Sequence, residues 1–173
     1  MQHSSESDDE TFMRRALALA ADAGEDGDVP VGAVLTVRNQ TFFARNEKER
    51  RADPTAHAEV LALRSAAATL GRWRLGEATV YVTKEPCVMC AGAIAAARIE
   101  RLVFGCRDPK GGAAGSVLDV FASAAVNHHV IVVAGVLEAE AAQQLADFFA
   151  ARRSRNAGRD GTADKGAWHG NVL

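Results

Sequence analysis

Short apolar stretches that are typical of buried strands alternate with helical stretches along most of this chain. In some segments the apolar residues recur at the spacing of a helix, and in others they form short runs rich in β-branched residues. We expect helices over Glu10–Ala23, Ala56–Leu70, Cys87–Ala97 and Glu138–Arg155, and strands over Val31–Val37, Thr41–Arg45, Ala78–Thr83, Glu100–Gly105 and His129–Ala134. Strand–helix alternation after a leading hairpin predicts a layered α/β fold around one mixed sheet.

Both ends of the chain lack this periodicity. The first seven residues are polar and acidic, and residues 156–173 are rich in Gly, Asp, Asn and Ala. Such composition is typical of disordered segments. We therefore expect a disordered acidic tail over residues 1–7, one folded domain over residues 8–155, and a disordered tail over residues 156–173.

The N-terminal residues and the apolar runs also indicate the cellular compartment and whether the chain associates with a membrane. The acidic start has neither the basic residues nor the apolar run of a signal peptide. The longest run of apolar or small residues, Cys87–Ala97, is far shorter than the roughly 20 residues that span a bilayer. We expect a cytoplasmic protein with reduced thiols and no membrane association.

Charge is unevenly distributed along the chain. The net charge is −2, but residues 1–28 hold eight acids and two bases, a sum of −6. Residues 29–173 hold the remaining fourteen acids and eighteen bases, a sum of +4. The net charge alone therefore does not exclude a polyanionic partner for the larger part of the chain.

Two motifs at predicted helix starts bring metal-binding residue types together. His57 and Glu59 open one helix, with Asp53 or Thr55 as its expected N-cap. Cys87 and Cys90 follow Pro86, which fixes a helix start and places the two thiols on one helix face.

One histidine and two thiolates predict a zinc site with three protein ligands, His57, Cys87 and Cys90. Three protein ligands leave a fourth tetrahedral position for water, as in catalytic zinc sites. Glu59 is the carboxylate expected to act there as the general acid and base. The third cysteine, Cys106, is expected to be a small buried packing residue.

Other functions share some of these residues. A zinc-stabilised RNA-binding module would need four protein ligands and no Glu59, and a redox protein using Cys87 and Cys90 would leave His57 and Glu59 unexplained. A zinc deaminase acting on free guanine, cytosine or cytidine would need every one of these residues. This last alternative stays open from the zinc motifs alone.

The H-A-E and P-C-x-x-C motifs resemble the signature of the cytidine and nucleobase deaminase superfamily. Beyond this superfamily signature, the surrounding sequence resembles that of the bacterial tRNA-specific adenosine deaminases. The matching stretches are VPVGAV at 29–34, DPTAHAE at 53–59, EPCVMCAGA at 85–93, VFG at 103–105, RDPKGGAAGS at 107–116 and DFFAARR at 147–153. The resemblance implies a three-layer α/β/α cytidine-deaminase-like fold around a mixed five-stranded sheet.

The resemblance also implies an activity and a set of site residues. The activity is the zinc-dependent conversion of adenosine to inosine at the wobble position of tRNA, by a homodimer with one Zn²⁺ per subunit that binds the anticodon stem-loop. Glu59 would shuttle protons, and Asn46 would hydrogen-bond the target nucleoside. The other residues implied to bind substrate are Ala58, Asp108, Lys110, Arg152 and Arg153.

Those outer residues also have plainer explanations. Asn46 is a common strand terminator, Asp108 suits a turn before Pro109, and the two final arginines complement a helix dipole. The basic residues before the first zinc motif, among them Arg45 and Lys48, fit an RNA approach or a mixed solvated loop equally well. Lys84 stands where these deaminases commonly have Leu, and we expect its charge to reach solvent or RNA.

Overall fold

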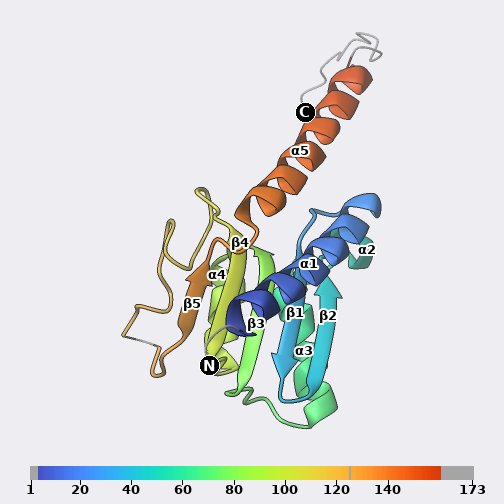
Figure 1. Cartoon of the computed structure of the whole chain (residues 1–173). Helices are drawn as coiled ribbons and strands as arrows, with labels where there is room; N and C mark the ends of the chain where they lie inside the picture. Colours follow the sequence, from blue (N-terminus) through green and yellow to red (C-terminus); the bar gives the residue numbers. More distant parts are fainter. Residues whose placement is uncertain (1–3, 125, 161–173) are drawn as a thin grey trace, which may run out of the picture.

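A five-stranded mixed sheet forms the centre of the computed structural model, which describes residues 4–124 and 126–160 (Figure 1). Its strands are β1 (Gly32–Val37), β2 (Gln40–Arg45), β3 (Ala78–Lys84), β4 (Arg101–Cys106) and β5 (Ile131–Ala134), in the order β2-β1-β3-β4-β5. The β1 strand is antiparallel to β2 and β3, whereas β4 is parallel to β3 and β5. The predicted hairpin and the predicted mixed five-stranded sheet are confirmed.

Helices cover both faces of the sheet and complete the three layers. They are α1 (Ser4–Glu25), α2 (Lys48–Arg51), α3 (Ala58–Leu70), α4 (Val88–Ala96) and α5 (Glu138–Asp160). The α1 helix lies across one face, α3 and α4 lie behind the sheet, and α5 extends beyond its upper end (Figure 1). The predicted α/β/α layering is therefore confirmed.

The β3 strand shows why the sheet needs a layer on each face. Val80 and Val82 belong to the core under α3 and α4, whereas Tyr81 belongs to the smaller core under α1. Successive strand side chains point to opposite faces, so a strand buried on both sides has a continuous apolar sequence. This is the pattern that marked the strand in the sequence.

The first helix begins earlier than predicted, at Ser4 rather than Glu10. One reason is a buried contact that follows from no local pattern. The two terminal guanidinium nitrogens of Arg101, on β4, donate to the Asp9 carboxylate at 2.7 and 2.6 Å, and the Tyr81 hydroxyl donates to it at 3.1 Å. These bonds fasten the N-terminal half of α1 to the sheet.

The predicted tails fall partly on helices. Both α1 and α5 extend into them, to Ser4 and Asp160, while residues 1–3 and 161–173 lie outside the described residues. The domain boundaries at residues 8 and 155 stay predictions. Within the described part of the chain, no helix is long and apolar enough to cross a membrane.

The predicted N-cap of α3 is wrong. His57, with extended backbone, occupies the N-cap position, and its side chain makes no capping hydrogen bond. Asp53 instead closes a turn of its own, because its carboxylate accepts hydrogen bonds from the backbone N–H and the hydroxyl of Thr55. The His57 imidazole is thereby free for another role.

Candidate metal centre and substrate cavity

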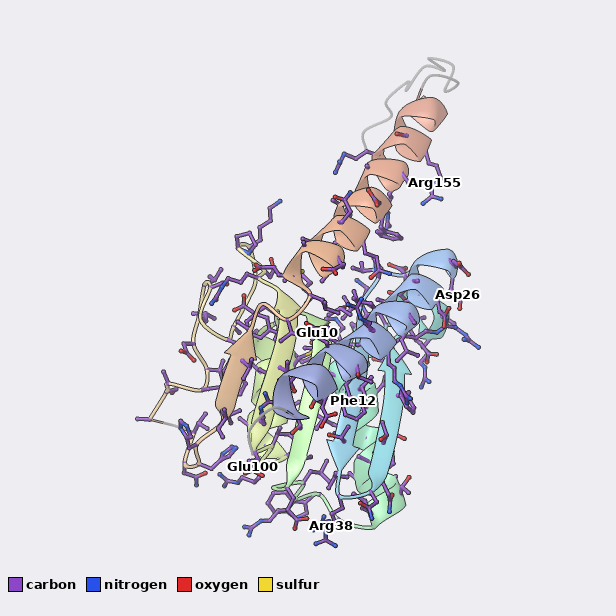
Figure 2. All side chains as sticks on the ribbon, viewed as in Figure 1. Glu10, Phe12, Asp26, Arg38, Glu100 and Arg155 are labelled. Atoms are coloured by element: carbon purple, nitrogen blue, oxygen red, sulfur yellow. The ribbon has the colours of Figure 1, made fainter. Side chains whose placement is uncertain are left out.

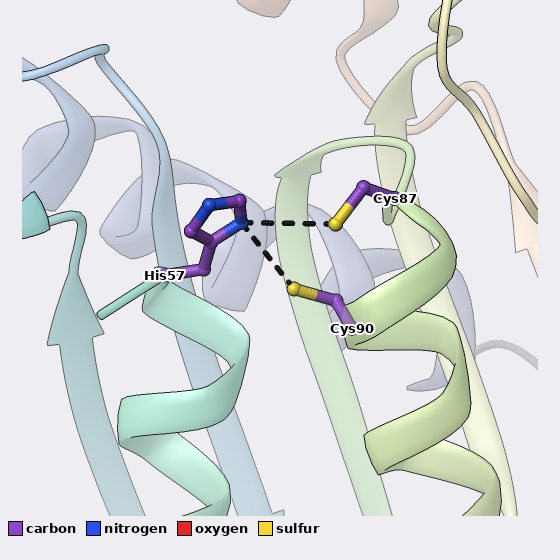
Figure 3. Close-up of side chains that lie close together, drawn as sticks. All are labelled: His57, Cys87 and Cys90. Atoms are coloured by element: carbon purple, nitrogen blue, oxygen red, sulfur yellow. Dashed lines mark hydrogen bonds between the residues drawn. The ribbon is translucent and has the colours of Figure 1, made fainter. Parts of the chain in front are cut away.

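Two helix starts carry the three predicted metal ligands. His57 is the N-cap of α3, Cys87 is the N-cap of α4, and Cys90 lies one turn into α4. The two helices pack side by side behind the sheet, so residues 30 positions apart in the sequence meet (Figure 3). His57 Nδ1 lies 3.8 Å from Cys87 Sγ and 3.5 Å from Cys90 Sγ.

The donor set fits zinc. The ligand atoms of His57, Cys87 and Cys90 all lie within 4.8 Å of one another, and all three groups are partly or fully buried. One imidazole and two thiols are the ligand types that zinc binds in tetrahedral sites. The third cysteine, Cys106, is buried on β4 and stands outside this group, as predicted.

The two thiols differ in their ionisation. Hydrogen bonds from Cys90 and His57 lower the pKa of the Cys87 thiol to about 3. The contact with Cys87, together with burial, raises the pKa of the Cys90 thiol. Cys87 is therefore the readier of the two to form the thiolate, which is the form that binds a metal.

Glu59 lies beside these ligands and is only 4% exposed. Burial raises the pKa of its carboxyl group. Among the described residues, its Oε2 atom has no hydrogen-bond partner. A buried carboxylate oxygen without a hydrogen-bond partner lowers the stability of the fold, so a purely structural role does not explain it. Such a group is suited to exchanging a proton with a bound substrate.

Asn46 connects the end of β2 to this centre. It is 8% exposed, and its side-chain oxygen accepts a 2.9 Å hydrogen bond from the backbone N–H of Ala58. The bond fixes the first turn of α3, and it leaves the amide nitrogen as the donor that Asn46 can offer a ligand. Ala58 is fully buried with its N–H in use, so its predicted contact with substrate stays a prediction.

A cavity of about 220 Å³ opens over His57 and Cys87, two of the three candidate ligands. Its wall carries metal-ligating, carboxylate, amide, ammonium and aromatic groups together. The lining residues are Val29, Val31, Asn46, Lys48, His57, Glu59, Lys84, Glu85, Cys87 and Phe149. A planar base fits within such a volume, with hydrogen-bonding and stacking groups on its walls.

The loop after β4 carries Asp108 and Lys110. The Asp108 carboxylate is paired with the Lys84 ammonium and accepts a 3.0 Å hydrogen bond from the Lys110 backbone N–H. Lys84 keeps 29% of its side-chain surface exposed and lines the cavity, so its charge reaches solvent as predicted. Its pairing with Asp108 was not predicted.

Glu85 is the functional-site residue that the sequence analysis missed. Its buried carboxylate accepts 3.0 Å hydrogen bonds from the backbone N–H groups of Asp108, Ala114 and Ser116, and another from the Ser116 hydroxyl. Burial alone would raise the pKa of Glu85, but these hydrogen bonds outweigh it and lower the pKa. Glu85 directly precedes Pro86 and the C-x-x-C motif, and this position was the signal in the sequence that could have identified it.

Arg152 and Arg153 are exposed on the far half of α5, where Figure 2 labels Arg155. Phe149, one turn earlier on the same helix, reaches the cavity wall. The structure thus brings the candidate metal ligands, Glu59 and Asn46 together and leaves the two arginines on the protruding helix.

The basic stretch around α2 is largely ion-paired. Arg45 contacts Asp26, and Arg51 contacts Glu47. Lys48 is the member of this stretch that lines the cavity. Of the two interpretations of these basic residues, a solvated loop of mixed charge therefore describes most of this surface.

The model for the MafB19-like deaminases matches residues 7–153. The chain belongs to the MafB19-like deaminase family. Among these deaminases, the tRNA-specific adenosine deaminase of Haemophilus influenzae is 49% identical over 84% of the chain and 85% of the relative. That of Bacillus subtilis is 44% identical over 85% of the chain and 92% of the relative.

A solved deaminase structure agrees with these sequence relatives. It comes from a study of A-to-I editing by tRNA:A34 deaminases at the wobble position of transfer RNA. Its TM-score is 0.75 at 44% identity, over 78% of this chain and 98% of the other. The deaminase fold therefore extends across nearly all of the domain described above.

Proposed function

We propose that this deaminase converts adenosine to inosine at the wobble position of tRNA in a zinc-dependent hydrolysis. The observation that carries the proposal is the buried Glu59 carboxylate, with an unpartnered oxygen, beside a His57–Cys87–Cys90 group that fits zinc. Relatives at 44–49% identity named as tRNA-specific adenosine deaminases support adenosine in tRNA as the substrate.

His57, Cys87 and Cys90 would hold one zinc ion per subunit. Zinc bound there supplies Lewis acidity, which lowers the pKa of water toward about 7. The three ligands come from two helix starts that are packed in place, so the site needs no large rearrangement to form.

Glu59 would move the protons of the reaction. Its carboxylate takes a proton from the attacking water, whose oxygen adds to C6 of adenine. Glu59 passes that proton to ring N1 and then transfers the second proton of the water to the leaving amine. The C6–N bond breaks, ammonia leaves and inosine remains, so one water is consumed for each ammonia released.

The target base must leave its stack to enter a cavity of this size. An anticodon loop presents single-stranded bases, which makes that step cheaper than in a duplex. Asn46 would donate to the nucleoside from the cavity wall, and Ala58 would contact it from the first turn of α3. Lys110, Arg152 and Arg153 would bind the phosphates of the anticodon stem-loop, with Asp108 on the adjoining loop.

The active form would be a homodimer in the cytoplasm. An apolar hollow of about 410 Å³ between α3 and α4 supports the dimer, and Trp73 beside it is 59% exposed. Exposed apolar surface of this kind is typical of protein interfaces. Measurement of the molar mass in solution tests the dimer, and a monomer at micromolar concentration would contradict it.

The test of function uses purified protein and unmodified tRNA that carries adenosine at the wobble position. Sequencing should find inosine at that position for the parent chain, and none for Glu59→Gln with its zinc retained. Glu100→Gln, which changes an exposed glutamate, serves as the matched control and should remain active. Activity on free guanine or cytidine, with no inosine in any tRNA, would favour the free-base deaminase instead.

A further inference from the structure

The end of β3 holds the loop of residues 107–117 through two successive side chains. Lys84 is the last residue of the strand and pairs with Cys106 on β4 in the sheet register. Asp108 follows Cys106 by two residues, which brings its carboxylate to the Lys84 ammonium. Glu85, the next residue, holds the same loop through the four hydrogen bonds described above.

Both residues line the cavity, but their side chains differ in exposure. The Glu85 carboxylate is enclosed by loop backbone, and a Cβ atom on Gly112 would lie 2.4 Å from Glu85 Cδ. The Lys84 and Asp108 side chains keep 29% and 14% of their surface exposed, and Lys84 lines the cavity. The ion pair is therefore at the cavity mouth, while Glu85 fixes the backbone of the loop independently of it.

The charge of Asp108 matters at this position. A nucleic acid that delivers a base to the cavity brings its phosphates to the mouth, where an unpaired carboxylate would repel them. Lys84 cancels that charge, while Lys110 is exposed on the same loop and Lys48 lines the cavity. A free base carries no phosphate, so its binding would not depend on the neutralisation of Asp108.

We infer that Lys84 is a specificity-determining residue for RNA: it neutralises Asp108 at the cavity mouth so that the phosphates of the anticodon loop can approach. The inference rests on the proposed function, because it concerns how the tRNA substrate reaches the same centre. Lys84 acts through Asp108 and touches no reacting atom.

A double-mutant cycle on Lys84 and Asp108 tests the inference, with inosine formation in an anticodon stem-loop RNA as the assay. Lys84→Met exposes the Asp108 carboxylate and should raise KM on the order of tenfold, within the range of coupling for charges in contact. Its kcat should change little, since the metal ligands and Glu59 are untouched. The KM increase should shrink at high salt, which screens the exposed carboxylate.

The double variant Lys84→Met/Asp108→Asn decides the question. Neutralisation predicts that it has the same KM as Asp108→Asn alone, because Lys84 then has no carboxylate to neutralise. A KM clearly above that of Asp108→Asn would overturn the inference and assign Lys84 a direct contact with phosphate. A fall in kcat without a change in KM would overturn it as well.

The control pair is Arg38 and Glu77, which is exposed and lies at the other end of the sheet. Val37, next to Arg38, pairs with Ala78 at the start of β3, whereas Lys84 ends that strand; Figure 2 labels Arg38 at the lower end. Arg38→Met should leave KM unchanged. If the parent chain makes no inosine at all, the proposed function fails; if it does and the cycle is additive, only this inference fails.

Discussion

Replacement of Glu85 by Gln should loosen the loop of residues 107–117 beside the cavity. The carboxylate faces donors only, the backbone N–H groups of residues 108, 114 and 116 and the Ser116 hydroxyl. An amide has one accepting oxygen, and its NH₂ group would face further donors. At least one buried N–H would therefore lose its acceptor.

The magnitude follows from the hydrogen bonds. A hydrogen bond to a charged group contributes about 1.5–3 kcal/mol, and a buried donor without a partner costs about 1–3 kcal/mol. We expect Glu85→Gln to lower the free energy of unfolding by about 3 kcal/mol at pH 7. For a domain of this size, that corresponds to a fall in Tm of roughly 6–12 °C.

The pH dependence has a definite sign. The folded pKa of Glu85 is lowered, so the ionised carboxylate stabilises the fold fully above its unfolded pKa, about 4.3. This contribution disappears as the pH falls through the lower, folded pKa. The difference in stability between the parent chain and Glu85→Gln should therefore shrink as the pH falls below about 4.

Urea unfolding at a series of pH values measures both effects, with the exposed Glu100→Gln as the matched control. The control should change the free energy of unfolding by less than about 0.5 kcal/mol. A Glu85→Gln effect as small as that of the control, or one independent of pH, would refute the assignment of Glu85 as the acceptor that holds the loop.

Two further substitutions test packing that the structure makes specific. Asp9→Ala removes the acceptor of the partly buried Arg101 guanidinium. It should lower the free energy of unfolding by about 3 kcal/mol, as measured by thermal unfolding. An effect below about 0.5 kcal/mol would contradict the anchoring of α1 to the sheet. Gly112→Ala places a Cβ atom 2.4 Å from the Glu85 carboxyl carbon and should cost about 1–3 kcal/mol in the same assay. Gly111→Ala, whose added atom would lie 3.4 Å from its nearest neighbour, is the control and should cost clearly less.

Local patterns were sufficient for the sheet and for the group of His57, Cys87 and Cys90 that could hold a metal ion. The apolar runs of the strands and the Pro86 that precedes α4 are features of a few neighbouring residues, and each acts through local geometry. His57 and the two cysteines were recognisable because metal ligands must be of a few chemical types, whatever their separation along the chain.

Contacts between distant residues were not predictable in this way. The pairs Asp9–Arg101 and Lys84–Asp108 join residues that are 92 and 24 positions apart, and no periodicity marks either partner. No pattern therefore indicated that Lys84 pairs with Asp108, and the start of α1 was predicted too late. Glu85 was missed because its role depends on the path of a loop without regular structure.

The central claim is that His57, Cys87 and Cys90 hold a zinc ion whose fourth position is left for water. X-ray absorption at the zinc edge of the purified protein measures the ligands directly. We predict one zinc per chain with two sulfur ligands at about 2.3 Å and two nitrogen or oxygen ligands at about 2.0–2.1 Å, one of which exchanges when a small anion is added. A third sulfur ligand, a second histidine, or a protein purified active without zinc would contradict the account.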